Sequence, residues 1–153
     1  MKLKELREQI EFEFDAMHSV IAELNLLRVE LAERVPTVRE KTAAAAFLAQ
    51  LYGGIENVLK RISRYCGVAM PSGESWHVEL FIRFCEPSYP PLPVLFDAPL
   101  ATAVTPYRKF RHVFHHGYSF QFDWERMYEG VSNAENVLVQ FRNKVNTFFA
   151  QAK

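Results

Sequence analysis

Apolar residues recur every three or four positions along most of this chain, which is the spacing that places side chains on one face of an α-helix. The first pattern predicts a long amphipathic helix from Lys2 to Val35, with lysine and glutamate at many of the remaining positions. Pro36 ends this helix, because a proline disfavours helical geometry in the residue before it. The predicted apolar face consists of Leu3, Leu6, Ile10, Phe14, Met17, Ile21, Leu24, Leu27 and Leu31.

A second helix is predicted over about residues 38–66. Thr37 can cap it, and Glu40 stands at the spacing of a capping box. Two adjacent glycines, Gly53 and Gly54, interrupt the pattern, although each glycine costs on the order of 1 kcal/mol in a helix interior. The close approach of another helix explains such a pair, and space for a ligand or a partner subunit is the alternative.

The third helix is predicted from Trp76 to about Cys85, with Ser72 or Ser75 as its cap. After it comes Glu86–Pro93, which is so rich in proline that neither a helix nor a central strand can form there. We expect this segment to be an ordered loop across the surface.

The helical pattern resumes at about Phe96. We expect Pro106 in the first turn of the next helix, and Asp123 as the cap of a last helix that continues to about Phe149. No segment shows sustained period-two alternation. The sequence therefore predicts an all-α bundle of about five helices, with two long helices first and one long helix last, as a single domain over residues 1–153.

Composition narrows the classes of function. The formal net charge is zero, whereas a protein that binds nucleic acid through bulk electrostatics is strongly basic. Binding of nucleic acid would therefore need a local patch, and residues 108–116 are the candidate. The two cysteines, Cys66 and Cys85, are not spaced as metal ligands, and no apolar run approaches the roughly 20 residues that span a bilayer. We expect a cytoplasmic protein with reduced thiols and no membrane association.

Candidate chemistry concentrates in one basic and histidine-rich segment. Its polar members are Arg108, Lys109, Arg111, His112, His115, His116 and Tyr118. Histidine titrates near neutral pH and is the side chain that most often acts as a general acid or base. On an ideal helix, Arg111 and His116 point roughly 140° apart. They can still converge through the length of the arginine or a loosened last turn at Gly117, or they can face a cleft made with a second subunit.

Three interpretations of this segment remain open from the residues alone. His112 and His116 stand at the helical spacing of metal ligands, but no Asp, Glu or Cys nearby in sequence completes a set. The histidines can equally be surface groups or satisfied core groups. In the third interpretation, an arginine neutralises a phosphate and a histidine moves the proton of a ribose 2′-hydroxyl, which suffices for metal-independent RNA cleavage.

The segment Arg111–Tyr118 matches the pattern R-x4-H-x-Y and resembles the signature of HepT-like toxins in the HEPN superfamily. The longer segment Phe110–Trp124 is similar to the corresponding part of HepT-like ribonucleases. So are Tyr52–Leu59 on the second helix and Glu74–Leu80 at the start of the third. The three segments occur in the family's order, and the resemblance covers nearly the whole chain.

The resemblance implies a HEPN-like helical bundle that forms a homodimer, in which the R-x4-H motifs of both subunits meet at a cleft. It implies a metal-independent ribonuclease toxin, without a cofactor, in a type II/VII-like toxin–antitoxin pair. By the same resemblance, Arg111 would bind the phosphate of the RNA substrate and His116 would be the catalytic histidine. The partner would be an MntA-type nucleotidyltransferase antitoxin that transfers AMP from ATP to Tyr118. A bulky anion two residues from His116 would occupy and repel the phosphate site.

Six further residues are candidates for a supporting role or for binding RNA. They are Arg108, His112, His115, Glu56, Trp76 and His77. Arg108 and His115 also fit a looser R-x6-H spacing. Glu56 is either a solvated or capping carboxylate or a partner for a histidine, and Trp76 is either an anchoring core aromatic or a platform for a base. The alternative function is a non-catalytic HEPN module that binds nucleotides or partners a nucleotidyltransferase.

Overall fold

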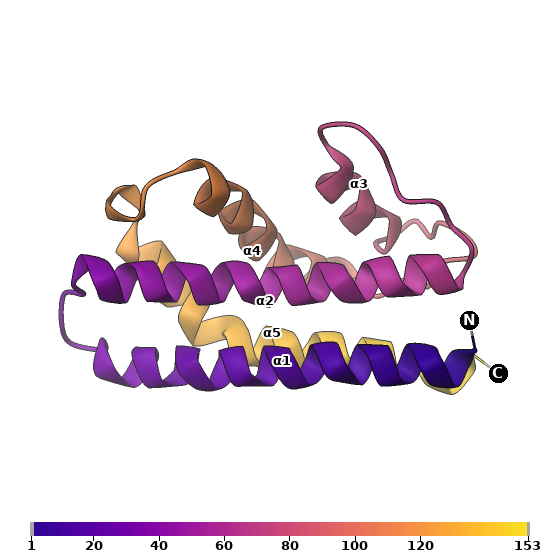
Figure 1. Cartoon of the computed structure of the whole chain (residues 1–153), viewed down its shortest axis with the longest axis horizontal. Helices are drawn as coiled ribbons and strands as arrows, with labels where there is room; N and C mark the ends of the chain where they lie inside the picture. The colour runs from indigo at the N-terminus through magenta and orange to yellow at the C-terminus, as the bar shows by residue number, and fades with distance from the viewer. Residues whose placement is uncertain (1, 153) are drawn as a thin grey trace.

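The computed structural model describes residues 2–152, which form five α-helices and one 3₁₀ turn (Figure 1). Within this range the only β-type pairing is an isolated bridge between Cys85 and Phe96. The all-α fold predicted from the sequence is therefore confirmed. The elements are α1 (Leu3–Glu30), α2 (Val38–Tyr65), α3 (Trp76–Arg83), α4 (Ala98–His116), η1 (Ser119–Gln121) and α5 (Trp124–Gln151).

Helix α2 is central, because it contacts α1, α3, α4, η1 and α5. The long helices α1 and α5 lie along one side of it, and α3 and α4 lie on the other side (Figure 1). The start of α1 meets the end of α5, where the guanidinium of Arg7 lies 4.5 Å from the ring centroid of Phe149. None of the helices in residues 2–152 combines the length and the apolar character that crossing a membrane requires.

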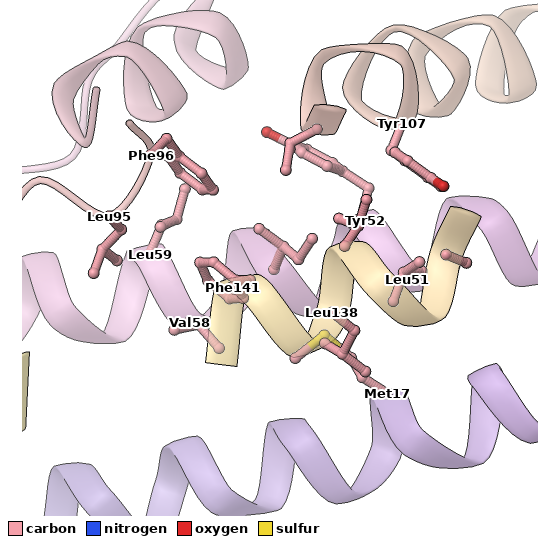
Figure 2. Close-up of a cluster of buried hydrophobic side chains, with 14 of the residues drawn as sticks. Met17, Leu51, Tyr52, Val58, Leu59, Leu95, Phe96, Tyr107, Leu138 and Phe141 are labelled. Atoms are coloured by element: carbon pink, nitrogen blue, oxygen red, sulfur yellow. The ribbon is translucent and has the colours of Figure 1, made fainter. Parts of the chain in front are cut away.

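Apolar side chains from all five helices form one buried core. Figure 2 shows part of it, with side chains from α1, α2, α4, α5 and the segment before α4. The ring of Phe141 stacks on that of Phe96 at 5.5 Å and lies 5.9 Å from that of Phe14. Burial of apolar surface is the main favourable term in folding. The helices therefore pack through the faces on which apolar residues recur every three or four positions.

Helix α1 ends at Glu30, so the prediction that it continues to Val35 is wrong. A proline favours the end of a helix before it, but packing decides where the helix actually ends. Leu31 is the last residue of this segment in the core, and Val35 is 87% exposed. No core contact therefore holds a further turn, and Arg34 instead donates two hydrogen bonds to the Glu40 carboxylate at the start of α2.

The predicted capping box at the start of α2 is confirmed. The Thr37 hydroxyl accepts a hydrogen bond from the Glu40 N–H, and the Glu40 carboxylate accepts one from the Thr37 N–H. Helix α2 then continues through both glycines without a break. A Cβ atom on Gly54 would lie 2.5 Å from Cγ of Met17, whereas one on Gly53 would meet nothing within 4 Å. The close approach of α1 therefore accounts for Gly54 alone.

Helix α4 begins earlier than predicted. Asp97 caps it by accepting a hydrogen bond from the Leu100 N–H, so Pro106 lies inside the helix rather than in its first turn. An interior proline removes one backbone hydrogen bond and tends to break a helix. Packing on both sides holds this one together, because Val104 and Tyr107 are buried and the Tyr107 hydroxyl donates a hydrogen bond to the Gly130 carbonyl at 2.6 Å.

Candidate functional site

A pocket of about 890 Å³ lies between α2, α3, α4 and the loop before α3. Eight of the nine predicted site residues contribute to its lining, so the fold gathers side chains from three separate parts of the chain. These eight are Glu56 on α2, Trp76 and His77 on α3, and Arg108, Arg111, His112, His115 and His116 on α4.

Helix α4 supplies one wall of this pocket. Its buried residues Leu100, Val104 and Tyr107 face the core, and its arginines and histidines lie on other faces. Arg111 has a side chain only 25% exposed and turns toward α2, whereas His116 is exposed at the last residue of the helix. The two motif residues thus line one pocket although they leave α4 in different directions.

The last turn of α4 is not loosened, so this one of the open ways for Arg111 and His116 to converge does not apply. The helix remains regular to His116, and Gly117 ends it in an extended conformation. A Cβ atom on Gly117 would lie 3.1 Å from the Val113 carbonyl oxygen and 3.2 Å from Cε1 of Phe122. This glycine therefore allows a close approach of chain segments and does not reorient His116.

The Arg108 side chain contributes to packing as well as to the pocket. Its guanidinium lies 5.6 Å from the ring centroid of Phe81 on α3. Its Nε atom is buried without a hydrogen-bond partner. Arg108 thus joins α4 to α3. Arg111 is held more loosely, because its Nη2 atom lies 3.8 Å from the Glu56 carboxylate, beyond hydrogen-bond distance.

A buried carboxylate lies beneath these cations. The Glu56 side chain is only 2% exposed, so it is neither the solvated nor the capping group that the sequence allowed. Its Oε2 atom lies 2.7 Å from Nδ1 of His77, at hydrogen-bond distance. Its Oε1 atom lies 3.8 Å from both Nη2 of Arg111 and Nζ of Lys60. A buried charge needs such compensation, because desolvation alone disfavours it strongly.

His77 reaches Glu56 from the first turn of α3. Its ring centroid lies 3.5 Å from that of the neighbouring Trp76, and its side chain remains 33% exposed. Trp76 is partly buried against the core, and Nζ of Lys60 lies 4.8 Å from its ring centroid. Trp76 therefore acts at least as an anchor that fixes the start of α3 over α2.

The charges of the pocket act on His115. Partial burial lowers its pKa, and the positive charges of Arg111, His116 and His77 lower it further. The negative charge of Glu56 acts in the opposite direction. Groups from all three helices around the pocket therefore lie within electrostatic range of His115.

Two residues that line or border the pocket were not identified from the sequence. Tyr52 is buried with its hydroxyl unpaired, and its burial together with the Glu56 charge raises the pKa of Tyr52. Lys60 lies on the same face of α2. Tyr52, Glu56 and Lys60 recur at four-residue spacing, and this row of polar groups on one face of an amphipathic helix was the signal that could have identified them.

Tyr118 is the one predicted site residue outside the lining of the pocket. It follows α4, is 68% exposed, and stacks on Phe120 with ring centroids 5.8 Å apart.

The interpretation of His112 and His116 as metal ligands finds no complete ligand set. The two rings are 4.6 Å apart, but residues 2–152 contain no group of three or more His, Cys, Asp or Glu side chains placed to hold a metal ion.

Comparison with known proteins identifies the family. The family model described as HepT-like protein matches residues 43–152, which extend from the first part of α2 to the end of α5 and include all the predicted site residues. No curated protein and no solved structure gives a significant match. Because the family model covers more than half of the sequence, the chain belongs to the HepT-like proteins.

Proposed function

We propose that this HepT-like protein is the toxin of a toxin–antitoxin pair and acts as a metal-independent endoribonuclease. The observation that carries the proposal is the pocket in which Arg111 and His116, the arginine and histidine of the R-x4-H motif, are accompanied by Arg108 and further histidines. Such a pocket offers positive charge for a phosphate and imidazoles for proton transfer.

The reaction is an attack of the ribose 2′-oxygen on its own phosphate. Arg111 holds the phosphate oxygens, because its planar fork of N–H groups matches phosphate geometry. The nearest Glu56 oxygen lies 3.8 Å from Nη2 of Arg111, beyond hydrogen-bond distance, which leaves these donors for the substrate. His116 takes the proton of the 2′-hydroxyl. The products carry a 2′,3′-cyclic phosphate and a 5′-hydroxyl.

A homodimer forms part of the proposal. His112, His115 and His116 are exposed on the wall of the pocket. A second copy packed against this wall would bring its own R-x4-H motif to the same cleft. RNA would then bind between two cationic surfaces, which explains how a chain of zero net charge can bind a polyanion.

Modification of Tyr118 is the proposed means of control. Its ring is exposed, and it lies two residues beyond His116. An MntA-type nucleotidyltransferase that moves AMP from ATP to the Tyr118 hydroxyl would add an anion beside the cationic pocket and repel the RNA phosphate. With antitoxin and ATP, the intact mass of the parent should rise by one or more AMP units, and that of Tyr118→Phe should not.

Cleavage of labelled RNA by purified protein in EDTA tests the enzymatic proposal. The parent and His18→Ala, which alters an exposed histidine on α1, should cleave RNA. Arg111→Ala and His116→Ala should each lose about 100-fold or more in rate, the first through lost charge stabilisation of the phosphate and the second through lost proton transfer. A His116→Ala protein as active as the parent would refute the assignment. An unmodified parent that cleaves nothing would favour a non-catalytic partner module.

A further inference from the structure

The contact between Glu56 and His77 has no part in the reaction described so far. It joins α2 to α3 through a hydrogen bond of 2.7 Å between a carboxylate and an imidazole. Its two ends differ in environment, since the Glu56 side chain is 2% exposed and that of His77 is 33% exposed. The carboxylate is therefore fixed beneath the pocket, while the imidazole keeps an accessible edge toward it.

The atoms that form this contact determine which nitrogen remains available. Nδ1 of His77 faces the Glu56 oxygen, and a carboxylate accepts hydrogen bonds, so Nδ1 carries a proton. Nε2 is then the nitrogen that can give or take a proton. When Nε2 also carries a proton, the ring is positive and the Glu56 carboxylate compensates the charge, as in other carboxylate–histidine pairs of enzymes.

Cleavage of RNA by 2′-hydroxyl attack needs two proton transfers. One group removes the proton of the 2′-hydroxyl, and another protonates the 5′-oxygen that leaves. His116 is assigned to the first transfer, and the second has no assigned group. A partly exposed imidazole, held by a buried carboxylate and lining the same pocket, has the chemistry that the second transfer requires.

We propose that His77 is the general acid of the reaction and that Glu56 is its positioning residue. The inference rests on the proposed ribonuclease function and adds to it a histidine outside the R-x4-H motif. His77 on α3 then enters the reaction with a proton on Nε2, and His116 on α4 enters it ready to accept one.

The step is balanced in atoms and electrons. The 2′-oxygen forms a bond to phosphorus as its proton passes to His116. The bond between phosphorus and the 5′-oxygen breaks, and that oxygen receives the proton from Nε2 of His77. His116 then carries a proton and His77 lacks one at Nε2, and exchange with water restores both. No metal, oxidant or further reactant takes part.

Several titratable groups line the pocket together with His77, so its own ionisation does not by itself identify its role. They are Glu56, Glu74, Arg108, Lys109, Arg111, His112, His115 and His116. Nζ of Lys60 also lies 3.8 Å from the Glu56 carboxylate that His77 contacts. The decisive test therefore alters the leaving group of the substrate, and a pH profile serves as a second readout.

A substrate with sulfur in place of the bridging 5′-oxygen isolates the acid, because a thiolate leaves without being protonated. On ordinary RNA, His77→Ala and His77→Asn should be slower than the parent by about 100-fold or more. On the sulfur substrate both should approach the rate of the parent. His116→Ala should remain slow on both substrates, because the attacking hydroxyl still needs its base.

His77→Asn separates catalysis from structure. The asparagine amide can still donate a hydrogen bond to Glu56, so the link between α2 and α3 is retained while Nε2 is lost. The alkaline limb in the pH dependence of kcat/KM for ordinary RNA should disappear in this variant. Glu56→Gln should lower the rate on ordinary RNA more than on the sulfur substrate.

The outcomes distinguish this inference from the proposed function. A parent that cleaves both substrates, with His77→Asn equally impaired on both, overturns the acid role and leaves the ribonuclease proposal intact. The same holds if His77→Asn cleaves ordinary RNA as the parent does. A parent that cleaves neither substrate overturns both proposals.

Discussion

Two glutamate carboxylates are buried against different faces of α2, and they differ in how they are paired. Glu13 of α1 accepts hydrogen bonds from Arg61 at 3.0 Å and from Asn57 at 3.3 Å, both on α2. Glu56 of α2 contacts His77 at 2.7 Å, but its arginine, Arg111, remains at 3.8 Å. The first cluster lies between long packed helices, and the second lies under the pocket.

Exposure alone does not separate these two clusters. The side chains of Arg61 and Arg111 are each 25% exposed. The two arginines differ in whether they donate a hydrogen bond to their carboxylate. Arg61 does, whereas Arg111 is near enough to compensate the charge of Glu56 but too far for a hydrogen bond. In the proposed function, an arginine that lies near a carboxylate without a hydrogen bond to it keeps its donors for a phosphate. The Glu13 cluster links α1 to α2, whereas the Glu56 cluster lies at the candidate site.

The largest expected effect comes from truncating the two arginines separately. Arg111→Ala should reduce RNA cleavage by about 100-fold or more, since a phosphate-binding group in the transition state is worth about 3 kcal/mol. Arg61→Ala should cleave at the rate of the parent at a temperature where it is folded. Initial rates on one labelled RNA compare them, and equal losses in both would remove the distinction between the two faces.

Stability should respond in the opposite order. Arg61→Ala leaves the buried Glu13 carboxylate with Asn57 as its remaining partner and should lower the free energy of unfolding by about 2 kcal/mol. Arg111→Ala should change it by less than about 1 kcal/mol, because its pairing is loose. Urea unfolding followed by circular dichroism measures both. A more stable Arg61→Ala protein would show that the link to Glu13 is not stabilising.

The adjacent glycines of α2 test the packed face at smaller magnitude. Gly54→Ala forces Met17 to move and should lower the free energy of unfolding by about 1 kcal/mol, the low end for overpacking. Gly53→Ala meets nothing within 4 Å and should raise it by about 0.5–1 kcal/mol through helix propensity. The melting temperature of Gly54→Ala should therefore fall below that of the parent, and that of Gly53→Ala should rise above it. Equal stabilisation would mean that α1 does not constrain this position.

Sequence periodicity predicted the helices well because apolar spacing and caps are local properties. Thr37 and Asp123 cap their helices as expected. The end of α1 and the start of α4 were placed wrongly, since tertiary packing decided both. Val35 finds no core contact, whereas buried neighbours keep Pro106 inside a helix.

The residues of the candidate site were predictable to a similar extent. Residues of one helix, such as Arg111 and His116, are identified together by spacing along the chain. The contact of Glu56 with His77 joins residues 21 positions apart on two helices, and it depends on how α3 packs over α2. No spacing rule contains that information. Glu56 and His77 could therefore be named as candidates, but their pairing could not.

The smallest expected effect is a shift in the titration of His115, which reports the charge of the pocket. Its pKa lies below the usual value because of partial burial and the positive charges of Arg111, His116 and His77. Arg111→Ala removes one of those charges and should raise the pKa of His115. Glu56→Gln removes the opposing negative charge and should lower it further.

NMR titration of the histidine ring protons measures these shifts, and the two faces of α2 provide the control. Arg61→Ala and Glu13→Gln change charge on the face toward α1, so the pKa of His115 should remain at the parent value. If these variants moved it as much as Arg111→Ala does, the field at His115 would come from the whole molecule. Opposite shifts from Arg111→Ala and Glu56→Gln, with none from the other pair, would mean that the pocket groups act on His115 as one local set.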